Sequence, residues 1–106
     1  MDKREVNNLV REIARGDISA AEKLYGLMKV PLLSFVAPYC ADFSEREDVV
    51  QAVFLKVIQK SPSLVFFTDC FAWMFRVAKN ECFDRARKRR LLPAEGPREE
   101  EDHFDL

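Results

Sequence analysis

The chain has 106 residues, of which 48% are hydrophobic and 33% charged, which suits one small globular domain with a single core. Three glycines and five prolines argue against a β-sandwich or a long linker. No apolar run approaches the roughly 20 residues of a membrane span. The N-terminus also lacks the apolar segment of a signal peptide, so the sequence predicts a cytoplasmic protein.

The net charge of −1 hides a separation of charge along the chain. Residues 1–75 carry nine basic and ten acidic side chains. Residues 76–90 carry seven basic and two acidic side chains, whereas residues 91–106 carry one and six. The overall charge therefore conceals a basic segment that is followed directly by an acidic one.

The cysteines and the single histidine argue against several chemistries. Cys40, Cys70 and Cys82 are odd in number and lack C-x-x-C spacing, which predicts reduced and mostly buried thiols. His103 lies in the acidic segment, so neither a zinc site nor a histidine-based catalytic site is expected. Since the sequence also has no glycine-rich phosphate loop, it predicts no enzyme, no metal and no cofactor.

Two helices are predicted in the first 40 residues. The first covers about residues 3–15 and ends at Gly16. Residues 19–22, S-A-A-E, fit a capping box, which predicts a second helix that continues to about Cys40. Pro31 lies inside this helix and should kink it.

A third helix is predicted over residues 45–60, after an S-x-x-E box at residues 44–47 and before Pro62, which should close it. Its expected core stripe is Val50, Val53, Phe54, Val57 and Ile58. Its opposite side carries Asp48, Gln51, Ala52, Leu55 and Gln59. Leu55 thus lies in the middle of a polar face, which is either a solvated surface with one stray leucine or a protein-docking patch.

A fourth helix is predicted from residue 70, with Thr68 or Asp69 as its cap, to about Leu92, before Pro93. Its expected core stripe is Phe71, Phe75, Ala78, Cys82 and Ala86. Its second face carries Arg76, Lys79, Asn80, Phe83 and Arg87, with Trp73 at the edge. Cations bind phosphates, an aromatic ring can stack on a base and an amide can read a base edge, so this face suits a nucleic acid.

Three fragments follow one another in the chain: GDISAAEKLY at residues 16–25, EREDVVQAVFLKV at 45–57 and FAWMFRVAKN at 71–80, followed by the basic run RARKRR. Together and in this order, they resemble region 2 of bacterial sigma factors, specifically the extracytoplasmic-function (ECF) group. The resemblance covers about residues 8–90. It implies an all-α, compact four-helix domain over residues 1–92 and an acidic interdomain linker or disordered tail over residues 93–106.

The resemblance also implies a function. In the family, this domain docks on the clamp-helix coiled coil of the largest RNA polymerase subunit and recognises and melts the promoter −10 element by binding the non-template strand. Carried over, the polymerase-binding residues are Asp48, Gln51 and Ala52, with Leu55 nearby. The DNA-binding candidates are Arg76, Lys79, Asn80, Phe83, Arg87 and Trp73, with Phe67 from the preceding loop. Among these, Asn80 is expected to make the polar base contact, and Trp73 fits the edge of the core better than a DNA contact.

The chain departs from the family pattern in ways that keep other functions open. Ala52 replaces a usual glutamate of the docking face, and the loop with Phe66 and Phe67 is apolar where the family has a polar, glycine-containing one. The helix-turn-helix domain that reads the −35 element is not expected before Leu106. An alternative is therefore a sigma-like regulator or decoy that binds polymerase or an anti-sigma factor without opening promoters. A nucleic-acid-binding helical domain unrelated to polymerase is the third possibility.

Overall fold

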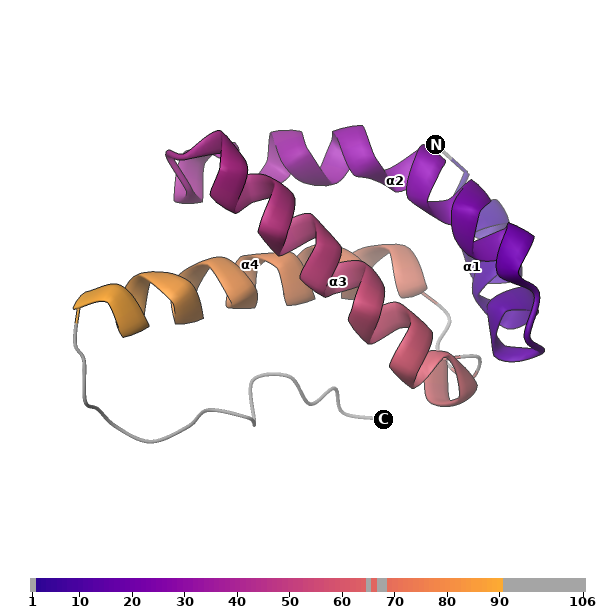
Figure 1. Cartoon of the computed structure of the whole chain (residues 1–106). Coiled ribbons are helices and arrows are strands. Elements are labelled where there is room, and N and C mark those ends of the chain that lie inside the picture. The colour runs from indigo at the N-terminus through magenta and orange to yellow at the C-terminus, as the bar shows by residue number, and fades with distance from the viewer. Residues whose placement is uncertain (1, 65, 67–68, 91–106) are drawn as a thin grey trace.

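A computed structural model of the chain describes residues 2–64, 66 and 69–90 (Figure 1). Its elements are α1 (Lys3–Ala14), α2 (Ile18–Val36), the 3-10 helix η1 (Ala37–Tyr39), α3 (Phe43–Leu64) and α4 (Cys70–Arg90). Each of the four α-helices contacts the other three. The predicted all-α, four-helix fold is therefore confirmed. The acidic segment at residues 93–106 lies outside the described residues.

The first helix ends where the sequence predicts. Gly16 has a φ of 95°, in the left-handed region that favours glycine. Its N–H donates to the Ile13 carbonyl at 2.9 Å, and the next N–H, of Asp17, donates to the Glu12 carbonyl at 3.0 Å. These two bonds satisfy carbonyls that the end of the helix would otherwise leave without donors.

The second helix begins earlier than the predicted capping box. Its cap is Asp17, whose carboxylate accepts hydrogen bonds from the backbone N–H of Ser19 at 3.0 Å and of Ala20 at 3.4 Å. The Ser19 hydroxyl also donates to this carboxylate, and it is the main cause that lowers the pKa of Asp17. Ser19 is therefore already inside α2, and the prediction that it caps the helix is wrong. Pro31 lies inside α2, as expected.

The third helix is longer than predicted at both ends. It begins at Phe43, before the expected cap, and continues through Pro62 to the buried Leu64. A proline lacks the N–H that would bond to the carbonyl four residues earlier, which here belongs to Ile58. The Ser61 hydroxyl donates to that carbonyl instead, at 3.3 Å. This replacement explains why Pro62 does not end the helix.

The fourth helix is capped by side chains from two directions. Asp69, one of the two predicted caps, accepts a hydrogen bond from the Ala72 N–H at 2.9 Å. Asn7 of α1 accepts one from the Cys70 N–H at 3.0 Å. The other predicted cap, Thr68, lies outside the described residues.

The buried face of α4 differs from the predicted stripe. Trp73, Met74 and Val77 are buried together with the expected Ala78 and Cys82. The expected Phe71, Phe75 and Ala86 are only half-buried. The buried face of α4 is therefore broader than the predicted stripe and is centred on a different side of the helix.

Two further core predictions have mixed outcomes. On α3, Val49 is buried, whereas Ile58, expected in the core, is 50% exposed. The three cysteines are free and buried, as predicted. None of the described helices is long and apolar enough to cross a membrane.

Candidate nucleic-acid and protein interfaces

The outward face of α4 brings together three of the predicted DNA-binding residues. Arg76, Lys79 and Phe83 are exposed along successive turns, and the Phe83 side chain is 46% exposed. Asn80 and Arg87 lie half-buried at the border of this face. The helix therefore presents cations and an aromatic ring to solvent on one side, as the sequence predicted.

Two predicted DNA-binding residues do not lie on this face. Trp73 is only 2% exposed and belongs to the hydrophobic core, so neither side of its indole ring is open to a stacking base. This is the location that the sequence favoured for Trp73. Phe67 lies outside the described residues, and its stacking role stays a prediction.

An aromatic residue that the sequence did not single out lies beside this face. Tyr39, the last residue of η1, is 38% exposed. Its ring meets that of Phe83 edge to face, with centroids 5.4 Å apart and planes at 89°. Lys79 Nζ lies 5.8 Å from each ring centroid, within the range of a cation–π interaction. We call Tyr39, Lys79 and Phe83 the aromatic–cation cluster.

The cluster is fixed from below by a row of aromatic contacts between α2 and α4. Phe35 packs against Tyr39 with centroids 5.9 Å apart and against Phe75 at 5.0 Å. Phe75 in turn packs against Phe71 at 4.9 Å. Such aromatic pairs favour tilted and edge-to-face geometries, so Phe35 holds the Tyr39 ring in place next to α4. The position of Tyr39 thus depends on how α2 packs on α4.

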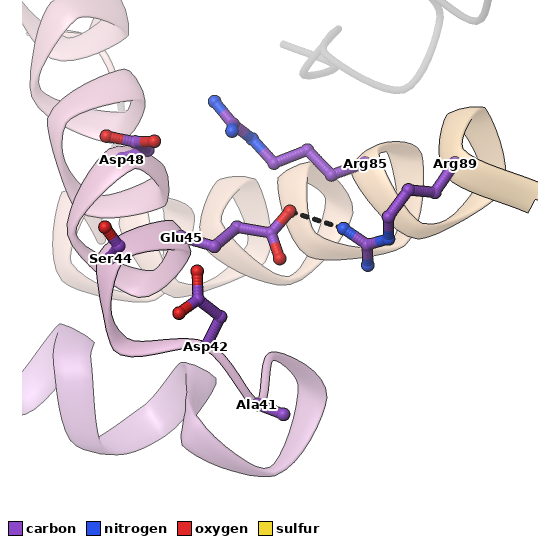
Figure 2. A pocket seen from close by; sticks show the side chains of 7 residues that line it. All are labelled: Ala41, Asp42, Ser44, Glu45, Asp48, Arg85 and Arg89. Atoms are coloured by element: carbon purple, nitrogen blue, oxygen red, sulfur yellow. Dashed lines mark hydrogen bonds and ion pairs between the residues drawn. The ribbon is translucent and has the colours of Figure 1, made fainter.

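Several arginines of the basic run are already paired with carboxylates. Arg85 Nε lies 2.9 Å from Glu81, and Arg87 pairs with Asp84. Arg89, at the end of α4, reaches across to Glu45 on α3 at 2.6 Å (Figure 2). Exposed pairs of this kind are weak, but each one offsets a positive charge that the sequence counts as available for DNA.

The α4 cations that have no carboxylate partner are therefore fewer than the sequence suggests. Among the α4 cations whose side chains the structure describes, Arg76, Lys79 and Lys88 make no ion pair with a carboxylate. Arg76 and Lys79 lie on the outward face, while Lys88 is exposed in the last turns of α4. On α4, the cations available to phosphates are thus concentrated beside the aromatic–cation cluster.

Glu45 joins the start of α3 to the end of α4. Partial burial of its carboxyl opposes ionisation, but hydrogen bonds from Arg89 and from the Cys40 thiol outweigh it and lower the pKa of Glu45. Figure 2 shows Arg85 and Arg89 extending from α4 toward α3, where Asp42, Ser44 and Asp48 line the same hollow. The hollow encloses about 550 Å³.

The predicted polymerase-binding residues also lie together. Asp48 and Gln51 are exposed, Leu55 is 59% exposed, and Ala52 is half-buried between them. All four line a shallow pocket of about 560 Å³ on the outer side of α3. We call these four residues the α3 docking face, after the role that the sequence predicts for them.

Four further side chains, which the sequence did not assign to this pocket, also line it. They are Tyr25 and Lys29 of α2, Glu47 of α3 and Arg85 of α4. Lys29 Nζ lies 5.6 Å from the Tyr25 ring centroid. Arg85 and Asp48 line both this pocket and the hollow of Figure 2, so the docking face continues to the basic end of α4. Among the described residues, no group of histidine, cysteine, aspartate and glutamate side chains could hold a metal ion.

The arrangement is that of a helical module with one face of mixed polar and apolar side chains on α3 and one cationic, aromatic face on α4. Residues 24–91 match the sequence model of sigma-70 region 2, which is more than half of the chain. The chain therefore belongs to the sigma-70 region 2 family, whose members take part in RNA polymerase binding and in recognition of the promoter −10 element. Comparison with curated proteins and with solved structures gave no match.

Proposed function

We propose that this chain is the region 2 domain of an ECF-type sigma factor that acts in the cytoplasm. It docks on the clamp-helix coiled coil of RNA polymerase through the α3 docking face. It then binds the non-template strand of the −10 element along the outward face of α4. The observation that carries the proposal is the presence of both faces on one small fold whose family binds polymerase and promoter DNA.

Binding energy for strand separation comes from capture of the unpaired strand, with no bond made or broken. Opening DNA costs about 1.4 kcal/mol of stacking per base-pair step. An unpaired base stacked on an aromatic side chain returns about 1–3 kcal/mol. Phe83 and Tyr39 supply exposed ring surface for such stacking, and Lys79 lies next to both rings to hold a phosphate. One captured base therefore offsets about one opened step.

Sequence selectivity is assigned to a different edge of the same helix. Asn80 is half-buried at the border of the outward face, where an amide can pair with the edge of an unstacked base. Arg76, exposed one turn earlier, would hold the adjacent phosphate. Phe67 keeps its proposed role as a ring for a flipped base.

Docking is assigned to the α3 docking face because its centre is apolar and its border is charged. Leu55 is 59% exposed, and burying a leucine fully is worth about 1.5–3 kcal/mol. Asp48 and Glu47 supply negative charge beside it for cations on the partner. Ala52 adds no charge here, so the contact depends more on Leu55 than it would with a glutamate at this position.

The test of docking is the affinity of the full chain for a clamp-helix coiled-coil fragment, measured by titration calorimetry. Asp48→Ala, Gln51→Ala and Leu55→Ala should each weaken binding, and Leu55→Ala should do so by about tenfold or more. Val30→Ala is a matched control, because Val30 is 67% exposed and lines none of the pockets described above. Unchanged binding by all three variants would remove the docking assignment.

A second function is favoured by two observations on α4. Trp73 is buried, and Arg85, Arg87 and Arg89 are paired with carboxylates, which leaves fewer groups for DNA than the sequence implied. A sigma-like decoy or regulator would bind polymerase or an anti-sigma factor through the α3 docking face without opening promoters. Fluorescence of 2-aminopurine placed in the −10 element separates the two functions, since only the initiation domain raises it in the presence of polymerase.

A further inference from the structure

An apolar groove lies between α1, α2 and α3, apart from the DNA-binding face. It encloses about 360 Å³. Its lining residues are Ile13, Ile18, Ala21, Glu22, Tyr25, Phe54, Val57 and Ile58. Glu22 is the only charged side chain among them, so the groove offers little to a nucleic acid or a small anion.

The border of this groove is unusually apolar for a surface. Ile18 is 72% exposed and Ile58 is 50% exposed, on opposite sides of the groove. Both rank among the most exposed large hydrophobic side chains of the described residues, and exposed apolar side chains grouped around a hollow mark interaction sites. Ala21 also lines the groove, three residues after Ile18 on α2, and its small side chain leaves space there. The groove thus has the shape and chemistry to receive aliphatic side chains.

The groove is continuous with the α3 docking face. Tyr25 lines both the groove and the pocket of that face. Leu55 and Ile58 are three residues apart on α3, so their side chains are neighbours on the helix surface. From Asp48 to Ile58 the helix rises about 15 Å, which a partner helix of about three turns would span.

We propose that the groove receives aliphatic side chains from the same polymerase helix that docks on the α3 docking face. This inference rests on the function proposed above and names the chemistry of its partner. The helix carries a cationic side chain opposite Glu47 and Asp48, and aliphatic side chains two to three turns away that enter the groove above Ala21. Laying an amphipathic helix into an apolar groove is a common mode of recognition, with anchors spaced by whole turns.

Two substitutions change the groove without touching the α3 docking face. Ala21→Leu fills the groove with a side chain of this protein and leaves the fold intact or more stable, because the new side chain packs against apolar neighbours. Ile18→Ser removes an apolar wall while leaving the core unchanged, since Ile18 is 72% exposed. Val30→Ser is the matched control, as an exposed β-branched residue of the same helix that does not line the groove.

The measurement is the affinity of the full chain for the clamp-helix coiled-coil fragment, with thermal unfolding followed by circular dichroism to check the fold. Ala21→Leu and Ile18→Ser should each weaken binding by about tenfold, equivalent to about 1.4 kcal/mol, and Val30→Ser should not. Asp48→Ala is included in the same series to test docking itself.

The outcomes separate the inference from the proposed function. If Asp48→Ala weakens binding and both groove variants bind as the unmodified chain does, docking stands and the groove proposal is wrong. If the unmodified chain does not bind the coiled coil, both proposals are wrong. Light scattering completes the series, because a dimer that Ala21→Leu converts to a monomer would assign the groove to a second copy of the chain and overturn the proposal.

Discussion

Removing the two exposed cations beside the aromatic–cation cluster should reduce the salt dependence of single-strand binding. Arg76 and Lys79 make no ion pair with a carboxylate among the described residues, so each can neutralise one phosphate. For single strands, each neutralised phosphate contributes about 0.7 to the slope of log K against log salt concentration. The double variant Arg76→Ala/Lys79→Ala should therefore lower that slope by about 1.4.

Arg87→Ala should change the slope of log K against log salt concentration only a little. Arg87 is paired with Asp84, so its charge is largely offset before DNA arrives. Between 50 and 200 mM salt, the unmodified chain should lose about sevenfold more affinity than the double variant, while Arg87→Ala should follow the unmodified chain. The expected difference between the variants thus depends on which cations are ion-paired in the folded domain, and not on the number of basic residues.

The assay is fluorescence anisotropy of a labelled −10 non-template oligonucleotide, titrated with the full chain at several NaCl concentrations. Arg15→Ala/Lys23→Ala is the control, since it removes two exposed cations near the α1–α2 turn. An unchanged slope in the double variant would contradict this prediction. A fall of about 0.7 in the slope for Arg87→Ala would contradict it as well.

Three further predictions concern stability. Asp69→Ala removes the cap on the Ala72 N–H and should lower the free energy of unfolding by about 1 kcal/mol in urea, whereas Asp69→Asn should retain most of it. Gly16→Ala should lower the free energy of unfolding by about 1 kcal/mol by the same measurement, because the φ of 95° at this position strains any other residue. The cause is the backbone and not crowding, since no atom lies within 4 Å of the added Cβ, and an unchanged urea midpoint would contradict this. Burial raises the pKa of the Cys70 thiol from 9.0 to about 11 and that of Cys82 to about 12. As pH rises, the unfolded chain therefore releases these protons before the folded chain does, so this contribution to the free energy of unfolding is fully present below pH 9 and is lost toward pH 11–12. Urea unfolding at pH 8 and pH 10 measures the loss, which should be smaller for Cys82→Val.

Local sequence signals were enough to predict the helices but not all of their ends. Gly16 ends α1 as predicted, because a left-handed residue acts within its own turn. Pro62 does not end α3, because the Ser61 hydroxyl bonds to the carbonyl that the proline leaves without a donor. The rule for proline is local, whereas its exception depends on a neighbouring side chain that the rule does not consider.

The sequence predicted the exposed side of α3 correctly but not the buried side of α4, because burial depends on how the helices pack against one another. The helical-wheel projection of α3 correctly separates the exposed Leu55 from the core, because Leu55 lies on the side of the helix opposite the stripe of apolar residues. The helical wheel of α4 misplaces the core, since Trp73, Met74 and Val77 are buried while the expected Phe71 and Phe75 are only half-buried. Tyr39 and Arg85 could not be assigned to their surfaces, because the sequence does not reveal how η1 and α4 align with their neighbours.

The contact between Asn7 and the Cys70 backbone N–H has a consequence for where this functional unit begins. The family match starts at residue 24, after the whole of α1. Yet α1 supplies that cap on α4 and places Val6 and Val10, both 0% exposed, in the core. Cutting the chain at the edge of the match would remove Val6 and Val10, whose burial is worth about 1.5–3 kcal/mol each, together with the buried Leu9 and Ala20. It would also leave the first turn of α4 free to fray. A fragment that keeps α4 capped and the core filled therefore includes about twenty residues that the family match does not contain.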